Sequence, residues 1–275
     1  MGNSYMTGKV MWIKTVTSLH AGCGSAMGAI DLPVQRERHT NWPLIPSSSL
    51  KGVFRDAQRQ AGDKPLENRL YGSEDAKSLS AGALSFTDAR LLAFPVRSLV
   101  GTFAWVSCPM ALQRWSRDSL LVGKQAAPFT KEVNEGQALV SADSILVHKN
   151  QVILEEFALK SEAADLSACS FLNAAERKRL VIVGDDQFSW FCEFATETVA
   201  RIGLEQGSKT VKKGALFYQE LVPPETVFYA LLSAGASQGN GEKVSAEANL
   251  ASFQHPDYLQ FGGDESTGRG LCHVS

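Results

Sequence analysis

Residues 22–59 read GCGSAMGAIDLPVQRERHTNWPLIPSSSLKGVFRDAQR. This segment is glycine-rich at its start, carries Asp31 in a turn, and ends in a basic stretch with regularly spaced apolar residues. Such a sequence predicts a shaped loop that leads into an amphipathic helix. We therefore expect the rest of the chain to be organised around this loop and helix.

The second half of the segment predicts a helix that begins near Ser47 and ends at Gly62. Apolar residues recur there at the spacing of a buried helical face: Leu50, Val53, Phe54, Ala57 and Ala61. Serine hydroxyls directly after Pro46 are expected to cap the first turn: Ser47, Ser48 and Ser49. The helix should therefore bury one face and present a capped N-terminus.

A row of cations flanks the apolar face of this helix. Lys51, Arg55 and Arg59 are each four residues from the last, so they line up along one side. Together with the backbone N–H groups of the serine-capped start, Lys51 and Arg55 form a candidate cradle for phosphate oxygens. The alternative is a solvated helix face, because charge along an exposed helix is ordinary.

The loop over residues 21–46 combines two kinds of constraint. Its glycines can adopt backbone conformations closed to other residues: Gly22, Gly24 and Gly28. Its prolines stiffen the return of the chain: Pro33, Pro43 and Pro46. We therefore expect a loop of defined shape that lies over a surface.

Asp31 is a lone carboxylate within this loop. A mostly basic cluster follows it: Arg36, Glu37, Arg38 and His39. One interpretation of Asp31 is an Asx-turn that braces the loop. The other is a functional carboxylate beside cations that bind phosphate.

The run from 19 to 55 closely resembles the N-terminal region of RAMP-superfamily proteins, specifically the repeated backbone subunit of the type III-B (Cmr) CRISPR effector. The shared features are an SSLKG helix start, a loop aspartate in the context IDLP, and the QRE that follows. The resemblance implies an α+β fold, a ferredoxin-like (RRM-like) RAMP domain with insertions that spans residues 1–275 as one domain.

Composition sets limits on the class of protein. A chain of 275 residues with 44% hydrophobic residues can bury a sizeable core. The formal net charge is −2, so nucleic-acid binding would need local basic patches. The region from 36 to 59 supplies one such patch: Arg36, Arg38, Lys51, Arg55 and Arg59.

Cysteine usage and hydropathy point to the cytoplasm. The five cysteines are scattered and contain no Cys-x-x-Cys pair, which favours reduced thiols. No apolar run approaches membrane-spanning length, and no charged-then-apolar leader is present. We therefore expect a cytoplasmic protein without a membrane partner.

Patterning predicts strands over 9–19, 83–94 and 98–107, and a helix over 111–121. With the helix that begins at 47, the order is strand, helix, strand, strand, helix, which opens a ferredoxin-like domain. His20 lies at the end of the first strand. It is either a hydrogen-bonded structural residue or a catalytic one.

Residues 123–180 are expected to be an insertion. A polar loop is predicted over 123–142, two short strands over 145–159, and a solvated turn over 176–179. A strand over 180–183 and an amphipathic helix over 185–200 are expected to follow.

The stretch from 199 to 218 predicts a projecting hairpin around Gln206-Gly207-Ser208. It holds an excess of basic residues: Arg201, Lys209, Lys212 and Lys213. These suit a phosphate backbone, or else protect an exposed edge. The resemblance implies that the hairpin is a thumb that wedges into the guide–target duplex.

A glycine-rich segment, FGGDESTGRG over 261–270, precedes the C-terminus. Neither a phosphate-binding P-loop nor a dinucleotide fingerprint is present. The resemblance implies a loop close to the guide RNA backbone, with Gly262, Gly263 and Arg269 as contacts. A tightly turned hairpin is the alternative.

Three functional classes follow: a backbone subunit that also cleaves target RNA, an RNA-binding scaffold, and a stand-alone metal nuclease. The last would need a carboxylate or histidine cluster, which is absent from the sequence. The resemblance implies an RNA-guided endoribonuclease of CRISPR antiviral defence, active in the assembled complex. Its partners would be guide RNA, target RNA, further copies in a filament, and other effector subunits.

The implied chemistry is attack by the RNA's own 2′-hydroxyl, which leaves a 2′,3′-cyclic phosphate. Asp31 would act as base or as ligand of a divalent metal ion, Mg²⁺ or Mn²⁺. Since a lone aspartate binds such an ion weakly, RNA phosphates would supply further ligands. Glu225, in the family-like PPETVFY over 223–229, and His20 are the next catalytic candidates.

Overall fold

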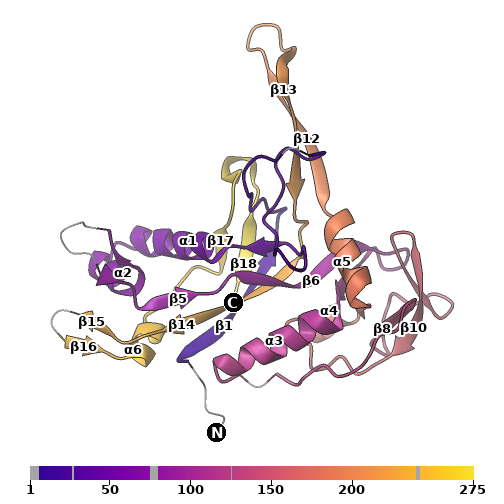
Figure 1. Cartoon of the computed structure of the whole chain (residues 1–275), viewed down its shortest axis with the longest axis horizontal. Coiled ribbons are helices and arrows are strands. Elements are labelled where there is room, and N and C mark those ends of the chain that lie inside the picture. Colours follow the sequence, from indigo (N-terminus) through magenta and orange to yellow (C-terminus); the bar gives the residue numbers. More distant parts are fainter. Residues whose placement is uncertain (1–5, 27, 75–79, 125, 240–241) are drawn as a thin grey trace.

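The computed structural model describes residues 6–26, 28–74, 80–124, 126–239 and 242–275, and Figure 1 shows the arrangement of their elements. A mixed sheet of 12 strands forms the body in this part of the chain. Its principal strand order is β17-β18-β1-β14-β6-β7-β11-β8-β10-β9. Among the described residues, no helix is both long and apolar enough to cross a membrane.

Four antiparallel strands form the centre of this sheet, in the order β18-β1-β14-β6. The helix α1 lies between β1 and β6 along the chain, and α6 lies between β14 and β18. The six elements are β1 (Gly8–Thr15), α1 (Ser47–Gln60), β6 (Ala89–Arg97), β14 (Val227–Ala234), α6 (Ala246–Ala251) and β18 (Leu271–Val274).

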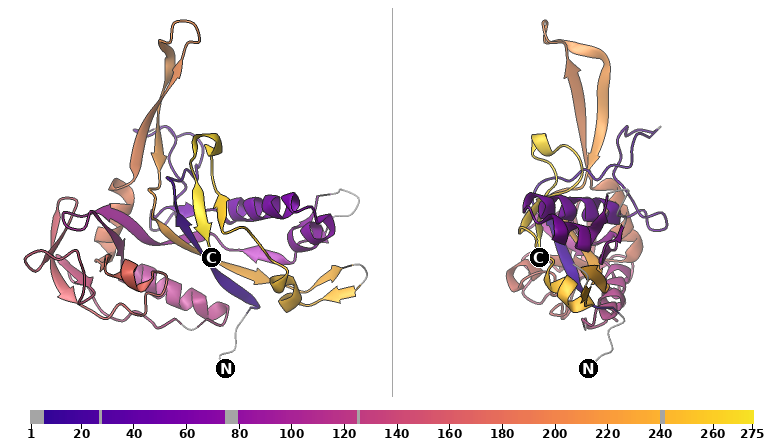
Figure 2. Two further views of the ribbon diagram at one scale, coloured as in Figure 1. Left: turned by 180° about the vertical axis from the view of Figure 1, so that it is seen from behind. Right: turned by 90° about the vertical axis from the view of Figure 1, so that its left-hand side faces the viewer.

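The central sheet is buried on both faces. In β1, Met11 and Ile13 belong to a hydrophobic cluster with α1, whereas Val10 belongs to a second cluster with α3 (Pro109–Leu121). Alternate side chains of a strand point to opposite faces, so β1 serves both layers. Figure 1 and Figure 2 show α1 and α3 on opposite sides of the sheet.

The predicted helix is present, although its cap differs from the prediction. Its apolar face buries Leu50 and Phe54, and the Phe54 ring stacks on Phe86 at 5.5 Å between centroids. The N-cap residue is Pro46, and no serine side chain caps the first turn. The serines lie within that turn, and the carboxylate of Asp88 accepts the Ser47 N–H at 2.7 Å instead.

Three strand predictions need correction. The strand expected over 9–19 is β1, which ends at Thr15, so His20 lies beyond the strand and not at its end. The expected strand over 83–94 is two strands, β5 (Leu84–Phe86) and β6. The expected strand over 98–107 is only β7 (Phe103–Ser107), because Gly101 and Thr102 have positive φ and turn the chain. β7 also lies outside β6, and β14 lies between β1 and β6.

The region from 123 to 183 extends the sheet beyond β7. The loop expected over 123–142 contains β8. Of the turn expected over 176–179, the first two residues end a short helix and the last two form a turn. The helix expected over 185–200 ends at Phe194. The elements are β8 (Gln137–Val140), β9 (Gln151–Leu154), β10 (Phe157–Ala163), α4 (Ala174–Arg177), β11 (Leu180–Ile182) and α5 (Asp185–Phe194).

Smaller elements complete the described part. Short strands and one further helix flank α1 and the central strands. They are β2 (Leu44–Ile45), α2 (Lys64–Tyr71), β3 (Gly72–Ser73), β4 (Ser80–Ala81), β15 (Ser237–Gly239), β16 (Glu242–Val244), β17 (Tyr258–Gln260) and the 3-10 helix η1 (Glu265–Thr267).

The hairpin predicted over 199–218 is present as β12 (Glu197–Leu204) and β13 (Val211–Leu221). It projects from the body in Figure 1 and in both views of Figure 2. The base of the hairpin lies beside the loop over 21–46, because residues 31 and 32 pair with β13. This backbone pairing brings the two informative segments of the sequence together.

Candidate active site at the base of the hairpin

The loop that contains Asp31 runs along the edge of β13 that β12 leaves free. The backbone N–H groups of Asp31 and Leu32 both donate to the Tyr218 carbonyl, at 3.1 and 3.0 Å. The N–H of Glu220 donates in turn to the Leu32 carbonyl at 3.0 Å. This pairing fixes the register of the loop on the hairpin base.

The Asp31 side chain adds a further contact to this edge. Its Oδ2 accepts the backbone N–H of Tyr218 at 2.7 Å. The residue is exposed, and its Oδ1 has no hydrogen-bond partner within the described part of the chain. Asp31 therefore braces the loop with one oxygen and presents the other to solvent.

The imidazole of His20 is held on the same strand. Its Nδ1 lies 2.8 Å from the Glu220 carbonyl oxygen. A carbonyl oxygen only accepts, so Nδ1 must carry the hydrogen, and Nε2 holds the lone pair in the neutral ring. A Cβ on Gly22 would lie 2.6 Å from Nε2, so glycine leaves space beside this atom.

Asp31 and His20 are neighbours along one strand edge. Alternate residues of a strand direct their N–H and C=O groups to the same edge. The Tyr218 N–H binds Asp31, and the Glu220 carbonyl binds His20. Tyr218 and Glu220 are two residues apart, which corresponds to about 7 Å along a strand. The fold thus aligns a carboxylate and an imidazole that are eleven positions apart in sequence.

The glycine-rich C-terminal loop also packs against His20. The Gly263 N–H donates to the His20 carbonyl at 3.0 Å, and a Cβ on Gly262 would clash with that carbonyl. Gly262 has φ +75°, a conformation that favours glycine. These glycines therefore allow close backbone approach at the site, as a tight turn requires.

A polar cluster joins this C-terminal loop to the hairpin. Arg201 Nη1 donates to Gln219 Oε1 and to Asp264 Oδ2, both at 2.8 Å. The Gln219 amide donates to the same Asp264 oxygen at 2.7 Å. A hollow of about 320 Å³ opens beside the cluster, with Thr267 and Arg269 on its wall.

Arg36 faces protein rather than solvent. Its guanidinium donates to the backbone carbonyls of Asn41 at 2.6 Å and Cys192 at 3.0 Å, and to the Glu220 carboxylate at 2.5 Å. Arg38, by contrast, is exposed. The sequence analysis did not identify Glu220 as a site residue. The available indication was a charged residue followed directly by the apolar Leu221 and Val222.

The cations on α1 also have protein partners. Arg55 Nε and Arg59 Nη2 bind the same oxygen of Glu67, at 2.9 and 3.0 Å, and Lys64 binds its second oxygen at 2.9 Å. Burial raises the pKa of Glu67, but hydrogen bonds from these three cations outweigh it and lower that pKa to about 2. Lys51 has no ion-pair partner among the described residues.

The start of α1 already receives an anion from the protein. Asp88 accepts the Ser47 N–H, so one backbone donor of the expected phosphate cradle is occupied. Ser48 and Ser49 lie in the first turn without a capping hydrogen bond. A phosphate at this end of the helix would lie near the Asp88 carboxylate.

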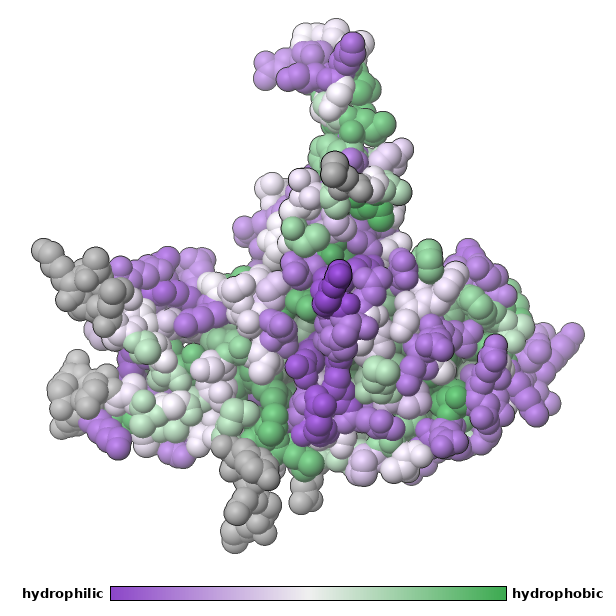
Figure 3. All heavy atoms as spheres, in the orientation of Figure 1, coloured by the Kyte–Doolittle hydropathy of each residue, from purple (hydrophilic) through white to green (hydrophobic). Residues whose placement is uncertain are grey.

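The hairpin carries charge at its tip and an apolar stripe on one face. Lys209, Lys212 and Lys213 are exposed at or near the tip. Below them, large apolar side chains are exposed on one face of the hairpin. They are the cross-strand pairs Ile202 with Leu216 and Leu204 with Val211, and the neighbouring Tyr218. Figure 3 shows the hydrophilic tip above the hydrophobic stem.

Glu225 lies in a different cluster. It has φ +71°, and its carboxylate binds Lys14 at 2.7 Å, while Glu176 binds the same ammonium at 2.9 Å. Its carbonyl accepts the Trp105 indole N–H at 2.7 Å. Within the described residues, none of its hydrogen bonds or ion pairs involves Asp31 or His20.

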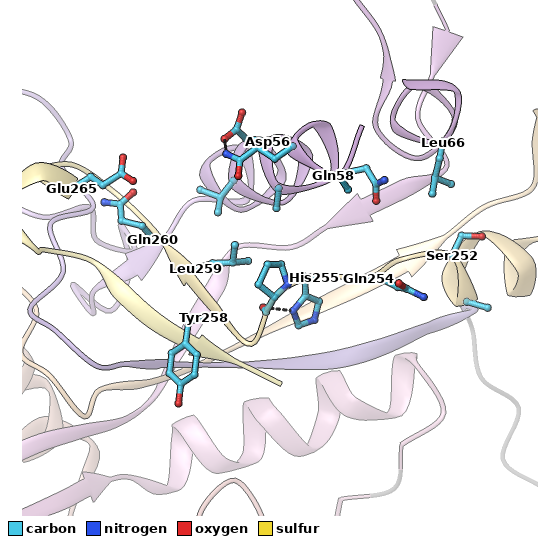
Figure 4. A pocket seen from close by; sticks show the side chains of 17 residues that line it. Asp56, Gln58, Leu66, Ser252, Gln254, His255, Tyr258, Leu259, Gln260 and Glu265 are labelled. Atoms are coloured by element: carbon cyan, nitrogen blue, oxygen red, sulfur yellow. Dashed lines mark hydrogen bonds between the residues drawn. The ribbon is translucent and has the colours of Figure 1, made fainter. Parts of the chain in front are cut away.

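The described residues contain no group of three or more histidine, cysteine or acidic side chains placed to hold a metal ion. A separate hollow of about 1110 Å³ lies between α1 and the segment over 254–260 (Figure 4). Asp56, His255 and Glu265 line it, and His255 Nδ1 bonds the Pro256 carbonyl at 2.9 Å. Neither Asp31 nor His20 borders this hollow.

Comparison with known proteins places the chain in a family. The sequence profile of the RAMP superfamily matches residues 12–273. The CRISPR system Cmr endoribonuclease Cmr4 of Pyrococcus furiosus is 34% identical, over 98% of this chain and 96% of the relative. The CRISPR system CMR subunit Cmr4 of Saccharolobus solfataricus is 26% identical, over 97% of this chain and 95% of the relative.

Solved structures agree with the sequence comparison. The crystal structure of oligomeric Cmr4 from Pyrococcus furiosus matches with a TM-score of 0.77 and 30% identity, covering 98% of each chain. The matched range includes the loop, the hairpin and the C-terminal glycines. The chain therefore belongs to the RAMP superfamily and, within it, to the family of the Cmr4 proteins.

Proposed function

We propose that this protein is the repeated backbone subunit of a type III-B CRISPR effector, which binds guide RNA and cleaves complementary target RNA at regular intervals. The observation that carries the proposal is the exposed Asp31 carboxylate on the edge of β13, with His20 held two residues along that edge. The name of the Pyrococcus furiosus relative, an endoribonuclease, supports the same activity.

The fold suits this role. The order β18-β1-β14-β6, with α1 and α6 as crossovers, is the pattern of a ferredoxin-like domain, and residues 1–275 would form one RAMP domain around it. The β12–β13 hairpin would be the thumb. Its apolar stripe offers side chains that can pack between unstacked bases, while its lysines suit phosphates.

The proposed reaction uses the target RNA as its own nucleophile. The 2′-oxygen attacks the adjacent phosphorus, the bond from phosphorus to the 5′-oxygen breaks, and a 2′,3′-cyclic phosphate and a 5′-hydroxyl result. A stacked duplex forbids the required in-line geometry, so a wedge that unstacks one nucleotide would allow it. Cleavage should then occur where each hairpin enters the duplex.

Asp31 and His20 can supply proton transfer to this reaction. The free Asp31 oxygen could accept the 2′-hydroxyl proton, and a protonated His20 Nε2 could donate to the leaving 5′-oxygen. Glu225 would stabilise the junction of β1, β7 and β14 through Lys14 and Trp105.

A divalent ion, Mg²⁺ or Mn²⁺, fits this site only in part. Mg²⁺ takes six oxygen ligands in octahedral geometry, and Asp31 has one free carboxylate oxygen among the described residues. The protein side chains do not form a complete metal site by themselves. RNA phosphates and waters would have to supply the other ligands, and we assign no step to the ion.

The guide RNA would bind through cations that have no ion-pair partner among the described residues. These are the exposed Arg38 and the three hairpin lysines, and the partly buried Lys51. The partly buried Arg269 lies beside the hairpin base, and the Gly262–Gly263 backbone lies against His20. Arg36, Arg55 and Arg59 already donate to carboxylates of the protein. To bind RNA, each would have to contact a phosphate in addition to that carboxylate. The other partners would be target RNA, further copies of this chain and other effector subunits.

The alternative is a scaffold subunit that binds RNA without cleaving it. The contact between Asp31 and the Tyr218 N–H favours it, because that contact alone would justify an aspartate in the loop. Asp31→Asn in the assembled complex separates the two functions. Loss of cleavage with retained target binding supports the nuclease. Unchanged cleavage would move the site elsewhere, with Glu225 and His20 as the next candidates, and would favour the scaffold if the cleavage came from a partner subunit.

A further inference from the structure

Glu220 is a buried carboxylate at the point where the loop, the hairpin and His20 meet. Its residue surface is 3% exposed. One oxygen accepts the Val34 backbone N–H at 3.0 Å, and the other accepts from Arg36 at 2.5 Å and from the Thr196 hydroxyl at 2.9 Å. Two segments of the chain, the loop over 34–36 and residue 196, therefore converge on one side chain.

The backbone of the same residue holds the two candidate catalytic side chains in register. The Glu220 N–H donates to the carbonyl of Leu32, the residue after Asp31. The Glu220 carbonyl accepts from His20 Nδ1. Its side chain meanwhile binds the loop again three and five residues beyond Asp31, at Val34 and Arg36.

Charge makes this arrangement specific to a carboxylate. A buried carboxylate requires a cation and hydrogen-bond donors, and Arg36 with two neutral donors meets that need. An amide in the same place could keep one or two hydrogen bonds. It would leave the half-buried Arg36 guanidinium without a counter-charge, which favours displacement of the loop.

We propose that Glu220 is the positioning residue of the Asp31 site, which holds the loop over 31–36 on the edge of β13 so that Asp31 and His20 face the same RNA position. This inference rests on the proposed nuclease function. Glu220 does not face the RNA in this role. It acts through Arg36, Val34 and the register of the loop.

The test compares Glu220→Gln with the parent in the assembled complex. Single-turnover cleavage should slow by about 10- to 100-fold, since small displacements of a reacting group have effects of that order. Guide binding and target affinity should stay within a few-fold. Hydrogen exchange of peptides spanning 30–36 should increase, because amides in this loop donate to β13 and to Glu220.

Asp118→Asn provides the matched control. Asp118 is 4% exposed and, like Glu220, accepts from an arginine and a hydroxyl, Arg90 at 2.6 Å and Tyr229 at 2.8 Å. It also binds the guanidinium of Arg117 at 2.8 Å, and it lies on α3. It should lower the melting temperature as Glu220→Gln does, yet leave the cleavage rate of folded complexes near that of the parent. A structural role alone would make both variants behave alike.

Thr196→Val is the second variant, in case Glu220→Gln does not fold. It removes one hydroxyl donor to Glu220 with little change in volume, and it should slow cleavage in the same direction by a smaller factor. Parent-like cleavage in Glu220→Gln, or in Thr196→Val where only that variant folds, would overturn the inference. An equal loss of cleavage in Asp118→Asn would also overturn the inference. If Asp31→Asn also cleaved normally, the proposed function of Asp31 itself would fail.

Discussion

The carboxylate of Asp31 accepts the backbone N–H of Tyr218 at 2.7 Å, a contact between residues 187 positions apart in the sequence. It fastens the tip of the loop to the base of the hairpin while one carboxylate oxygen stays exposed. The position of Asp31 therefore depends on the position of the hairpin base. This linkage places the candidate catalytic group where the hairpin would open the RNA duplex.

Asp31→Asn should abolish target cleavage in the assembled complex. Asn keeps the size of the side chain, and its carbonyl oxygen can still accept the Tyr218 N–H, so the loop should stay in place. The charge is lost, and single-turnover cleavage should fall by about 100-fold or more. Target affinity, measured by filter binding, should stay within a few-fold of the parent.

A modified target RNA and the end groups of its products distinguish 2′-hydroxyl attack from hydrolysis. A target with one 2′-deoxy nucleotide at a cut position should resist cleavage there alone, since the nucleophile is missing. Products from other positions should end in a 2′,3′-cyclic phosphate. Cleavage at the deoxy position with a 5′-phosphate product would indicate a hydrolytic nuclease instead.

Shortening the hairpin across Gln206-Gly207-Ser208 should separate guide binding from cutting. The body of the protein and the loop that holds Asp31 remain, so guide RNA should still co-purify. The wedge is lost, and cleavage should become slow or mispositioned on a sequencing gel. A milder pair, Ile202→Ser with Leu216→Ser, removes part of the apolar stripe only and should act in the same direction. Unchanged cut sites and rates would show that the hairpin is not the wedge.

Lys51→Ala should weaken guide-RNA binding through a lost phosphate contact. Affinity measured against salt concentration should show a slope reduced by about 1, as expected for one phosphate contact. Arg55→Ala is the comparison, because Arg55 already binds Glu67 and Gly72. Its main effect should be a lower melting temperature. An unchanged salt slope in Lys51→Ala would remove this residue from the RNA interface.

Glu67 should make folding stability depend on pH in the acid range. Its folded-state pKa is lowered from 4.5 to about 2, so the stability it contributes is present above pH 4.5 and lost as the pH falls toward 2. Glu67→Gln should lower the free energy of unfolding by about 2 kcal/mol at neutral pH. Urea titrations should show this difference shrinking with acidification; a difference that stayed constant would contradict the ion-pair account.

Local sequence patterns determined much of the fold. The apolar spacing in α1, the turn residues at the hairpin tip and the polar–apolar changes in α3 report on contacts within a few residues. Those elements appear where they were expected. Local patterns did not predict two long-range features. These are the place of β14 between β1 and β6 and the strand β8 within a polar stretch. Both depend on which strand edges meet in the sheet.

The family, the loop aspartate and the basic hairpin could be predicted from the sequence, because contiguous motifs and turn residues carry them. Which charged groups remain free could not be predicted, because it depends on how the folded chain packs. Arg36 is neutralised by Glu220, 184 residues away, and Arg55 by Glu67 on the neighbouring helix. A cation in a sequence looks the same whether it faces solvent or a buried carboxylate, since that partner is brought close only by packing.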